Sequence, residues 1–313
     1  MSKLSGHGKG ENSAPAVGAL VTDLTGRNLK ADGRERGTIE QIAVVAHSAA
    51  DRAADAAIAV RTEGSLNCSY KSSRDLLTAA DLASEKQIIS TIQAAFPDHA
   101  ILSEESLRAT PEQLARGPLW IVDPIDGTVN FSRGIRHWAI SIAFAIDGKV
   151  QYGIVFAPDL GERYEATLGS GAFLNGNAIR SREPSSLVDT LVATGFPYDR
   201  SATALIAARA ERVLKSCADL RRFGAASLDC CLVASGRIDA YYEDVAPWDI
   251  AAGALIVREA GGATGPYQEA EQSSGLTPPR PSDLVSERFL ATGTGGSSEL
   301  RAQLIQLLRP PVA

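Results

Sequence analysis

Membrane-spanning and secretory segments are missing from this 313-residue sequence. No window approaches the roughly 18 consecutive apolar residues that a membrane span requires. The polar start, residues 1–13, also lacks the apolar stretch of a secretory signal. Both absences predict a cytoplasmic protein that makes no contact with a membrane.

Clusters of Lys and Arg are absent as well, and the formal net charge is -6. Nucleic-acid affinity rests mainly on concentrated positive charge, which neutralises the phosphate backbone. We therefore do not expect nucleic acid as the main ligand.

Cysteine is scarce, and no two of the four cysteines show the C-x-x-C spacing of many metal and redox sites. Two of them are adjacent and would point in different directions on a helix. We therefore expect reduced, buried thiols rather than a disulfide or a metal site at Cys68, Cys217, Cys230 and Cys231.

The hydrophobic content, in contrast, is 44%, which suffices for one large domain or two medium ones. Residues 1–37 are rich in Gly, Ser, Asn and charge without apolar periodicity, so they are predicted to form a disordered tail. Apolar residues at helical spacing then predict helices over residues 38–61 and 81–96, the second ended by Pro97.

Short apolar runs and turn signals predict the remaining elements. Strands are expected at residues 100–103, 119–122, 139–146, 151–157, 163–168, 191–194 and 289–292. Helices are expected at residues 202–215, 226–235, 249–260 and 298–308. Residues 261–283 are rich in Gly, Pro, Ser and Gln and are predicted to form a long loop. Helices and sheets therefore alternate in layers.

The sharpest chemical feature is the stretch of residues 120–131, WIVDPIDGTVNF, in which an apolar strand runs into Asp123 and Asp126. Pro124 disfavours the helical region for Asp123, and Gly127 with Thr128 suits a tight turn into a helix. Two carboxylates are thus held at one strand end, beside backbone N–H groups that can receive an anion. This arrangement suits a metal ion together with a phosphate group.

Further acids stand at other element boundaries, where hard cations such as Mg²⁺ would need several oxygen ligands to converge. They are Asp81, Glu104, Glu105 and Asp249. Taken alone, Asp81 or Asp249 is best interpreted as a helix cap. The conjunction of strand-end acids, the proline-fixed turn and the Gly-Thr pair predicts a metal site.

These residues resemble the inositol monophosphatase family. The first family signature matches residues 120–131, and the second matches residues 248–262, WDIAAGALIVREAGG. The order of the other pieces is similar too, and the resemblance covers residues 39 to 308. These pieces are DLLTAAD at 75–81, SEES at 103–106, GAFLNG at 171–176 and RFGAAS at 222–227.

The resemblance implies a layered αβαβα sandwich, an α+β / α/β fold shared with fructose-1,6-bisphosphatase. Its N-terminal α+β half would span residues 38–180 and carry most metal ligands, and its C-terminal α/β half would span 181–313 with the site between them. A homodimer and inhibition by Li⁺ are also implied. The chain departs from the family in the long stretch after Gly262, and Ala225 replaces a hydroxyl residue found in some members.

The resemblance further implies two to three Mg²⁺ ions per subunit. One would be held by Glu104, Asp123 and the backbone carbonyl of Ile125, a second by Asp123, Asp126 and Asp249, and a third, weaker one by Glu104 and water. Water would attack the phosphate without a covalent intermediate, helped by the Thr128 hydroxyl hydrogen-bonded to Asp81. The catalytic residues would be Asp81, Glu104 and Thr128.

For the substrate, the resemblance places the phosphate on the N–H groups of Gly127 and Thr128, with Lys71 as a distant positive charge. The positions that match the family's hydroxyl contacts are Asp126, Gly224, Ala225, Ala226, Glu243 and Asp249. A small phosphorylated polyol or sugar-like molecule is expected. Inositol 1-phosphate is favoured, ahead of histidinol phosphate and fructose 1,6-bisphosphate.

The sequence offers two other interpretations. His137 near Ser132 and Ser141 allows a nucleophilic serine mechanism, but no nucleophile-elbow sequence surrounds either serine. A role outside catalysis is also open, because one bacterial member of the family works with RNA polymerase. Nothing in the residues predicts that partner specifically.

Overall fold

The computed structural model describes residues 37–71, 76–106, 109–110, 113–114, 116–196, 201–267, 284, 288–295 and 298–309. The predicted tail therefore lies outside the described residues except for Gly37. Most of the predicted loop at 261–283 lies outside them as well. None of the helices in the described ranges is long and apolar enough to cross a membrane.

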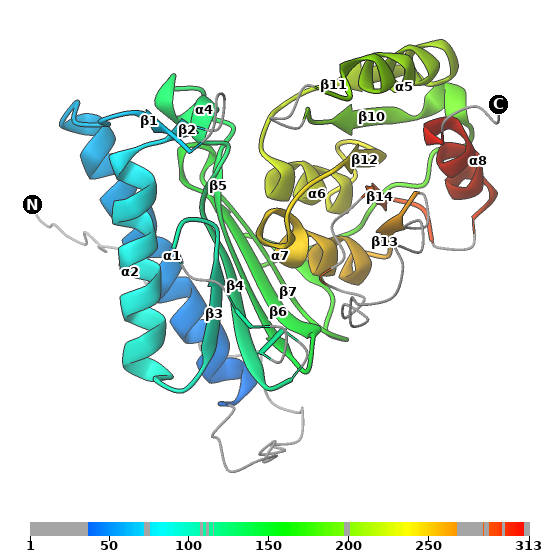
Figure 1. The fold of residues 1–313 in the computed structure, drawn as a ribbon. Coiled ribbons are helices and arrows are strands. Elements are labelled where there is room, and N and C mark those ends of the chain that lie inside the picture. Colours follow the sequence, from blue (N-terminus) through cyan, green and yellow to red (C-terminus); the bar gives the residue numbers. More distant parts are fainter. Residues whose placement is uncertain are drawn as a thin grey trace, which may run out of the picture.

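Two helices, α1 (Ile39–Thr62) and α2 (Ala79–Ala95), form the first layer (Figure 1). Each begins with a threonine that accepts a hydrogen bond from a backbone N–H of the first turn, in a capping box. The alanine-rich face of α1 is buried and lets the helices approach closely. Together the two helices cover one face of a sheet.

That sheet has seven strands in the order β3-β4-β5-β6-β7-β8-β9, of which only β3 and β4 pair in parallel. Alternate residues of β4 face opposite layers, because side chains alternate along a strand. Trp120 and Val122 pack toward α1 and α2, whereas Leu119 and Ile121 pack toward the interior helices. The strands are β3 (Ala100–Ser103), β4 (Pro118–Asp126), β5 (Ala139–Ile146), β6 (Lys149–Ala157), β7 (Glu162–Thr167), β8 (Ala172–Leu174) and β9 (Asn177–Ile179).

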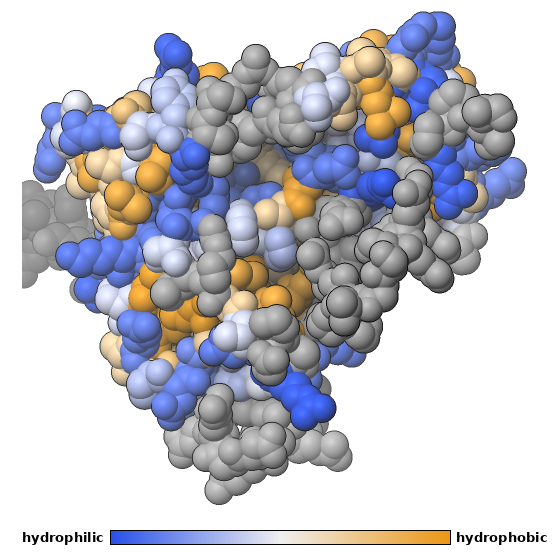
Figure 2. Space-filling model, viewed as in Figure 1, coloured by the Kyte–Doolittle hydropathy of each residue, from blue (hydrophilic) through white to orange (hydrophobic). Residues whose placement is uncertain are grey.

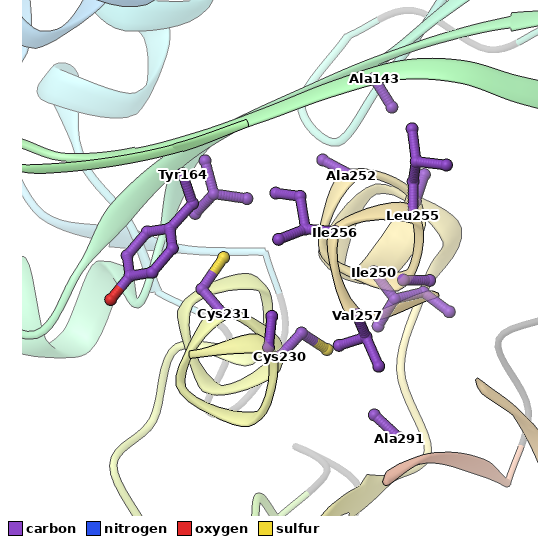
Figure 3. Packing of buried hydrophobic residues seen from close by; sticks show 14 of the residues in the cluster. Ala143, Tyr164, Cys230, Cys231, Ile250, Ala252, Leu255, Ile256, Val257 and Ala291 are labelled. Carbon is purple, nitrogen blue, oxygen red and sulfur yellow. The ribbon is translucent and has the colours of Figure 1, made fainter. Parts of the chain in front are cut away.

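The middle layer consists of α6 (Ala226–Ala234) and α7 (Pro247–Glu259). Every residue from Ile250 to Val257 is buried, so α7 has no solvent face and contacts both sheets. Figure 3 shows Cys230 and Cys231 on α6 among the apolar side chains of α7 and of the sheets. Two large sheets therefore share one continuous core.

The second sheet has five strands in the order β11-β10-β12-β14-β13, with β10 parallel to both β11 and β12. Its outer face, which includes Val192 and Tyr242, packs on α5 (Thr203–Ser216) and α8 (Glu299–Leu308). Its inner face, which includes Ala193 and Tyr241, packs on the middle layer. The strands are β10 (Leu191–Thr194), β11 (Asp219–Arg221), β12 (Ala240–Glu243), β13 (Ala263–Pro266) and β14 (Phe289–Thr292).

The layers thus follow one another as helices, sheet, helices, sheet, helices, which confirms the predicted αβαβα sandwich (Figure 1). The first sheet ends at Ile179 and the second begins at Leu191. The division into halves at residue 180 as separate structural units stays a prediction. Figure 2 shows hydrophobic residues gathered over strands of the seven-stranded sheet, in the centre of a largely hydrophilic face.

Some elements were missed or wrongly predicted. The missed strands β1 (Ser69–Tyr70), β2 (Leu76–Leu77), β8, β9, β11 and β12 have two to four residues, too few for an alternating pattern to stand out. The predicted loop was wrong at its start, where β13 pairs with β14 as an edge strand that tolerates its proline. Three cysteines are buried as expected, but Cys68 is exposed because it precedes the exposed strand β1.

Gly153 on β6 allows the middle layer to approach the first sheet. A Cβ at this position would lie 2.9 Å from the Cα atom of Ala252 on α7, so the backbones would have to separate. We expect Gly153→Ala to lower the free energy of unfolding by about 1–3 kcal/mol, measured by urea denaturation. Gly295→Ala is the control, because nothing lies within 4 Å of a Cβ there. Equal stability of the two variants would contradict this packing.

Candidate active site

A β-bulge at the end of β4 brings Asp123 and Asp126 to the same side of the sheet. Asp123 pairs with Ser141 and Asp126 with Ala139, so three steps along β4 match two steps along β5. Residues three apart in a regular strand point to opposite faces, and the extra residue of a bulge reverses this alternation. Both carboxylates therefore reach one cavity.

The turn after the bulge requires a glycine. Gly127 has φ 89° and ψ 39°, the left-handed conformation, and leads into the short helix α4 (Thr128–Ser132). A Cβ on Gly127 would also lie 3.1–3.2 Å from atoms of Gly224, Ala225 and His137. Both the backbone angle and the close approach of the C-terminal half exclude a larger residue.

The cavity, which is lined by residues of the first sheet and of the segments that lead into α6 and α7, has a volume of about 440 Å³. Ten of the residues that the sequence assigned to the site line it: Glu104, Asp123, Ile125, Asp126, Gly127, Thr128, Gly224, Ala226, Glu243 and Asp249. Asp81, Lys71 and Ala225 are not among the lining residues. The cavity is large enough for a small phosphorylated molecule.

Four carboxylates of the cavity influence one another electrostatically. Burial, and then the charges of Glu104, Asp126 and Asp249, raise the pKa of Asp123 well above its usual value. The pKa of Asp249 is raised by burial and by Glu104 and Asp126. Burial also raises the pKa of Asp126 to about 6, although hydrogen bonds from Ser227 oppose the shift. The cluster thus favours protons or cations.

Asp126 and Asp249 also hold the starts of the two middle-layer helices. Asp126 accepts hydrogen bonds from the backbone N–H of Ala226 at 3.0 Å and of Ser227 at 2.7 Å, at the beginning of α6. Asp249 accepts one from the backbone N–H of Ala246 at 2.7 Å, at the beginning of α7. Asp249 therefore both caps α7 and lines the cavity, so the two predicted roles are compatible.

Asp81 likewise has two roles. It accepts a hydrogen bond from the backbone N–H of Thr78 at 2.7 Å, which caps α2. Its other oxygen lies 3.1 Å from the Thr128 hydroxyl, which is also 3.1 Å from the carbonyl oxygen of Ile125. Burial raises the pKa of Asp81 to about 6. The Thr128 hydroxyl can therefore donate a hydrogen bond to Asp81, a carboxylate that changes protonation state near pH 6.

Lys71 contacts the site through an acidic pair. Its Nζ lies 2.7 Å from Glu104 and 2.8 Å from Glu105. Burial lowers the pKa of Lys71, but the two carboxylates outweigh this effect and raise it. Burial and the charge of Glu104 raise the pKa of Glu105 to about 7. Lys71 thus partly neutralises Glu104 on the N-terminal side of the cavity.

Glu243, at the end of β12, forms the opposite wall. It accepts a hydrogen bond from the Tyr241 hydroxyl at 2.6 Å, and burial raises its pKa to about 7. Its carboxylate lies directly over Gly195, where a Cβ would stand 1.7 Å from Oε2. The glycine therefore lets Glu243 reach the cavity.

The nucleophilic serine mechanism has no geometric support. His137 Nε2 lies 2.9 Å from Asp229, whereas the Ser141 hydroxyl donates to the carbonyl of Trp248 and that of Ser132 donates to the carbonyl of Val129. In the described part of the chain, His137 therefore connects the segment before β5 to α6 and activates neither serine.

The chemistry of the cavity fits hard divalent cations. Carboxylates and a backbone carbonyl are the ligands that Mg²⁺ prefers, and the raised pKa values indicate uncompensated negative charge. Among the described residues, no three His, Cys, Asp or Glu side chains already enclose one metal position. Binding would therefore require carboxylates to turn toward the ion about their side-chain torsions.

Other lining residues were missed as site residues by sequence reasoning, although several stand in stretches that resemble the family. These are Val129, Phe196, Arg222, Asp244, Val245, Ala246 and Trp248. Arg222 belongs to the RFGAAS stretch, and Trp248 is the first residue of the second signature. Their position in these stretches could have identified them as site residues. Ser227, which binds Asp126 through both its N–H and its hydroxyl, was missed too.

The structure is a layered αβαβα sandwich with an acidic cavity, as expected of a metal-dependent phosphatase fold. A model of the inositol monophosphatase family matches residues 38–309. The chain belongs to this family of phosphatases.

Known relatives agree in sequence and fold. The Nus factor SuhB of Pasteurella multocida is 42% identical over 199 residues, which cover 63% of this chain and 74% of the relative. The extragenic suppressor protein SuhB of Bartonella henselae has 32% identity and a TM-score of 0.74, covering 87% of this chain and 99% of that structure. Inositol monophosphatase from Anabaena has 31% identity and a TM-score of 0.70, covering 88% and 98%.

The raised pKa values predict how the metal-free protein responds to pH. Folding raises the pKa of Asp126 from 3.8 to about 6 and raises that of Asp123 as well, so the folded state binds protons more tightly. Stability should therefore fall as pH rises from about 4 through 6 and beyond. Asp123→Asn should reduce this fall and melt at a higher temperature than wild type in EDTA at about pH 8.

Thermal melting in EDTA and in Mg²⁺ measures both effects. Mg²⁺ should raise the melting temperature of wild type more than that of Asp123→Asn, because ligand binding stabilises the folded state. Asp55→Asn, on the exposed face of α1, is the matched control and should behave as wild type. An unchanged pH dependence in Asp123→Asn would show that this carboxylate carries no electrostatic penalty.

The Thr128 hydroxyl should matter more than its methyl group, because it lies between Asp81 and the cavity. We expect Thr128→Val, which keeps the shape, to lower kcat on a phosphomonoester by about a hundredfold or more. Thr128→Ser keeps the hydroxyl and should lose far less. Circular dichroism checks that both variants fold. Similar kcat values for the two variants would rule out a role in proton transfer.

Proposed function

We propose that this protein hydrolyses inositol 1-phosphate to inositol and phosphate, with two to three magnesium ions per subunit. The observation that carries this proposal is the convergence of Glu104, Asp123, Asp126 and Asp249 on one cavity beside the Gly127-Thr128 turn. Four carboxylates, of which Asp123 and Asp126 are buried and the other two half-buried, repel one another and any phosphate, so a phosphatase site of this kind requires cations. Membership of a family that is generally magnesium-dependent supports the same cofactor.

The ligands follow from the family resemblance. Glu104, Asp123 and the carbonyl of Ile125 would hold one ion, and Asp123, Asp126 and Asp249 would hold another. Glu104 would contribute to a third. Bound Mg²⁺ would supply positive charge that lowers the pKa of water and stabilises the charge developing on the phosphate and the leaving oxygen.

The protein's own groups orient the phosphate and move the proton. The backbone N–H groups of Gly127 and Thr128 would bind phosphate oxygens. The attacking water would give its proton to the Thr128 hydroxyl, which passes its own proton to Asp81 at 3.1 Å. As the new P–O bond forms, the bond to the alcohol oxygen breaks, and water protonates that oxygen. No covalent intermediate is required.

The opposite wall would bind the alcohol part. Glu243, Asp126 and Asp249 offer acceptors for substrate hydroxyl groups, and Gly224 and Ala226 bring backbone close to them. Ala225 supports this wall from behind Gly127. Lys71 would act at a distance through its bond to Glu104.

Three further properties are proposed from the resemblance. The protein would work as a homodimer in the cytoplasm, and Li⁺ would inhibit it by replacing a weakly held Mg²⁺. Light scattering that finds only monomer would contradict the first property. Full activity in roughly tens of millimolar Li⁺, a range suited to competition at hard oxygen ligands, would contradict the last.

The deciding assay measures phosphate release from inositol 1-phosphate, histidinol phosphate and fructose 1,6-bisphosphate, each with Mg²⁺ or EDTA. Wild type should prefer inositol 1-phosphate and lose activity in EDTA. Asp123→Asn should lose orders of magnitude, because removing charge stabilisation in a buried site is costly. A metal-dependent preference for histidinol phosphate or fructose 1,6-bisphosphate would contradict inositol 1-phosphate as the substrate but agree with the proposed mechanism.

A second candidate function is regulation through RNA polymerase. It is favoured by the name Nus factor of the SuhB relatives at 42% identity. Deletion of the chromosomal gene followed by complementation tests it: Asp123→Asn should restore growth and still co-purify with polymerase if this role dominates. Rescue by wild type alone, with growth lost alongside activity, would contradict it.

A further inference from the structure

Among the described residues that line the cavity, Arg222 is the only cation. Six carboxylates line the same cavity: Glu104, Asp123, Asp126, Glu243, Asp244 and Asp249. Arg222 follows the short strand β11 and lines the cavity next to Phe196 and Gly224. Its position is therefore on the side assigned to the alcohol part of the substrate.

The guanidinium is fixed by packing rather than by an anion. Its Cζ atom lies 5.7 Å from the centroid of the Phe196 ring, a cation–π contact. It also lies against Gly224, where a Cβ would stand 2.2 Å from Nη1. Within the part of the chain that the structure describes, Arg222 has no ion pair. Arg222 as a whole is exposed, so its charge is open to the cavity.

The acids around Arg222 already have other partners. Glu243 accepts from the Tyr241 hydroxyl, and Asp229 lies 2.9 Å from His137. Asp244 accepts from the backbone N–H of Arg288 at 2.6 Å. The positive charge of Arg222 lowers the pKa of Glu243 and Asp229 from a distance, but neither carboxylate depends on it as a bonded partner. The guanidinium donors therefore remain for a ligand.

We propose that Arg222 is a specificity-determining residue that binds a second anionic group, a phosphate or carboxylate, on the alcohol part of those substrates that carry one. The inference rests on the proposed phosphatase function. With one phosphate at the Gly127-Thr128 turn, a second anionic group on the same substrate would reach Arg222, which lines the same cavity beside Gly224. A planar guanidinium binds such groups through two parallel hydrogen bonds.

The charge of the alcohol part then decides how each substrate depends on Arg222. The alcohol part of fructose 1,6-bisphosphate carries a second phosphate group. The alcohol part of inositol 1-phosphate is neutral, and that of histidinol phosphate carries a cationic amine. Loss of the guanidinium should lower kcat/KM for fructose 1,6-bisphosphate and leave kcat/KM for inositol 1-phosphate nearly unchanged. It should not lower kcat/KM for histidinol phosphate. The cavity accepts polyol monophosphates and, through Arg222, sugar or polyol bisphosphates.

The test compares kcat/KM for these three substrates in wild type, Arg222→Gln, Arg222→Lys and Arg221→Gln. Arg222→Gln should lose roughly tenfold or more on fructose 1,6-bisphosphate, the size expected for hydrogen bonds to a charged group. Arg222→Lys keeps the charge and should retain part of this activity. The neighbouring Arg221 pairs with Asp219 and does not line the cavity, so Arg221→Gln should leave the ratio of the substrates unchanged.

Equal losses on all three substrates in Arg222→Gln would mean that the arginine only supports the wall, and no loss on any would mean that it is idle. Either result overturns the proposal. If wild type hydrolyses none of the substrates, the phosphatase function itself fails. Calorimetric binding of fructose 1,6-bisphosphate to wild type and Arg222→Gln then still tests Arg222, with equal affinity overturning its role.

Discussion

The hydrogen bonds between the Asp126 carboxylate and the first turn of α6 are the interaction on which the site depends. Asp126 is the last residue of β4 in the first sheet, whereas Ala226 and Ser227 belong to the middle layer. One side chain thus connects the first sheet to the middle layer at the edge of the cavity. Gly127 makes the same approach possible, because a Cβ there would meet Gly224 and Ala225. The candidate active site therefore lies where the first sheet meets the middle layer.

The N-termini of three helices offset part of the negative charge of the carboxylates around the cavity. Asp81 caps α2, Asp126 binds the start of α6, and Asp249 binds the start of α7. Backbone N–H groups and the positive end of each helix dipole stabilise these carboxylates. Burial nevertheless outweighs this effect, since the pKa values of all three are raised. The remaining negative charge makes the cavity suitable for cations. At Glu104 the ammonium group of Lys71 neutralises part of that charge.

Much of the fold and part of the site were predictable because their signals are local. The strands 100–103, 139–146, 191–194 and 289–292 coincide with the observed β3, β5, β10 and β14, as their apolar runs are bounded by turn residues. The short strands β8, β9, β11 and β12 were missed because three or four residues carry little pattern. The two long signatures indicated the family, and ten of the assigned site residues line one cavity. Glu105 stands beside a site residue, yet its partner is Lys71.

By itself the sequence determined the kinds of side chain and their local frames: a strand that ends in two aspartates, a proline-fixed turn, a glycine and helix caps. These features depend on neighbouring residues, so they can be inferred from spacing. Only the tertiary structure decided that a bulge turns Asp123 and Asp126 to one side, that Ser227 binds Asp126 across 101 positions, and that Arg222 faces the cavity while Arg221 does not. Such contacts join residues far apart in the chain, and their geometry is set by packing between layers rather than by local preference.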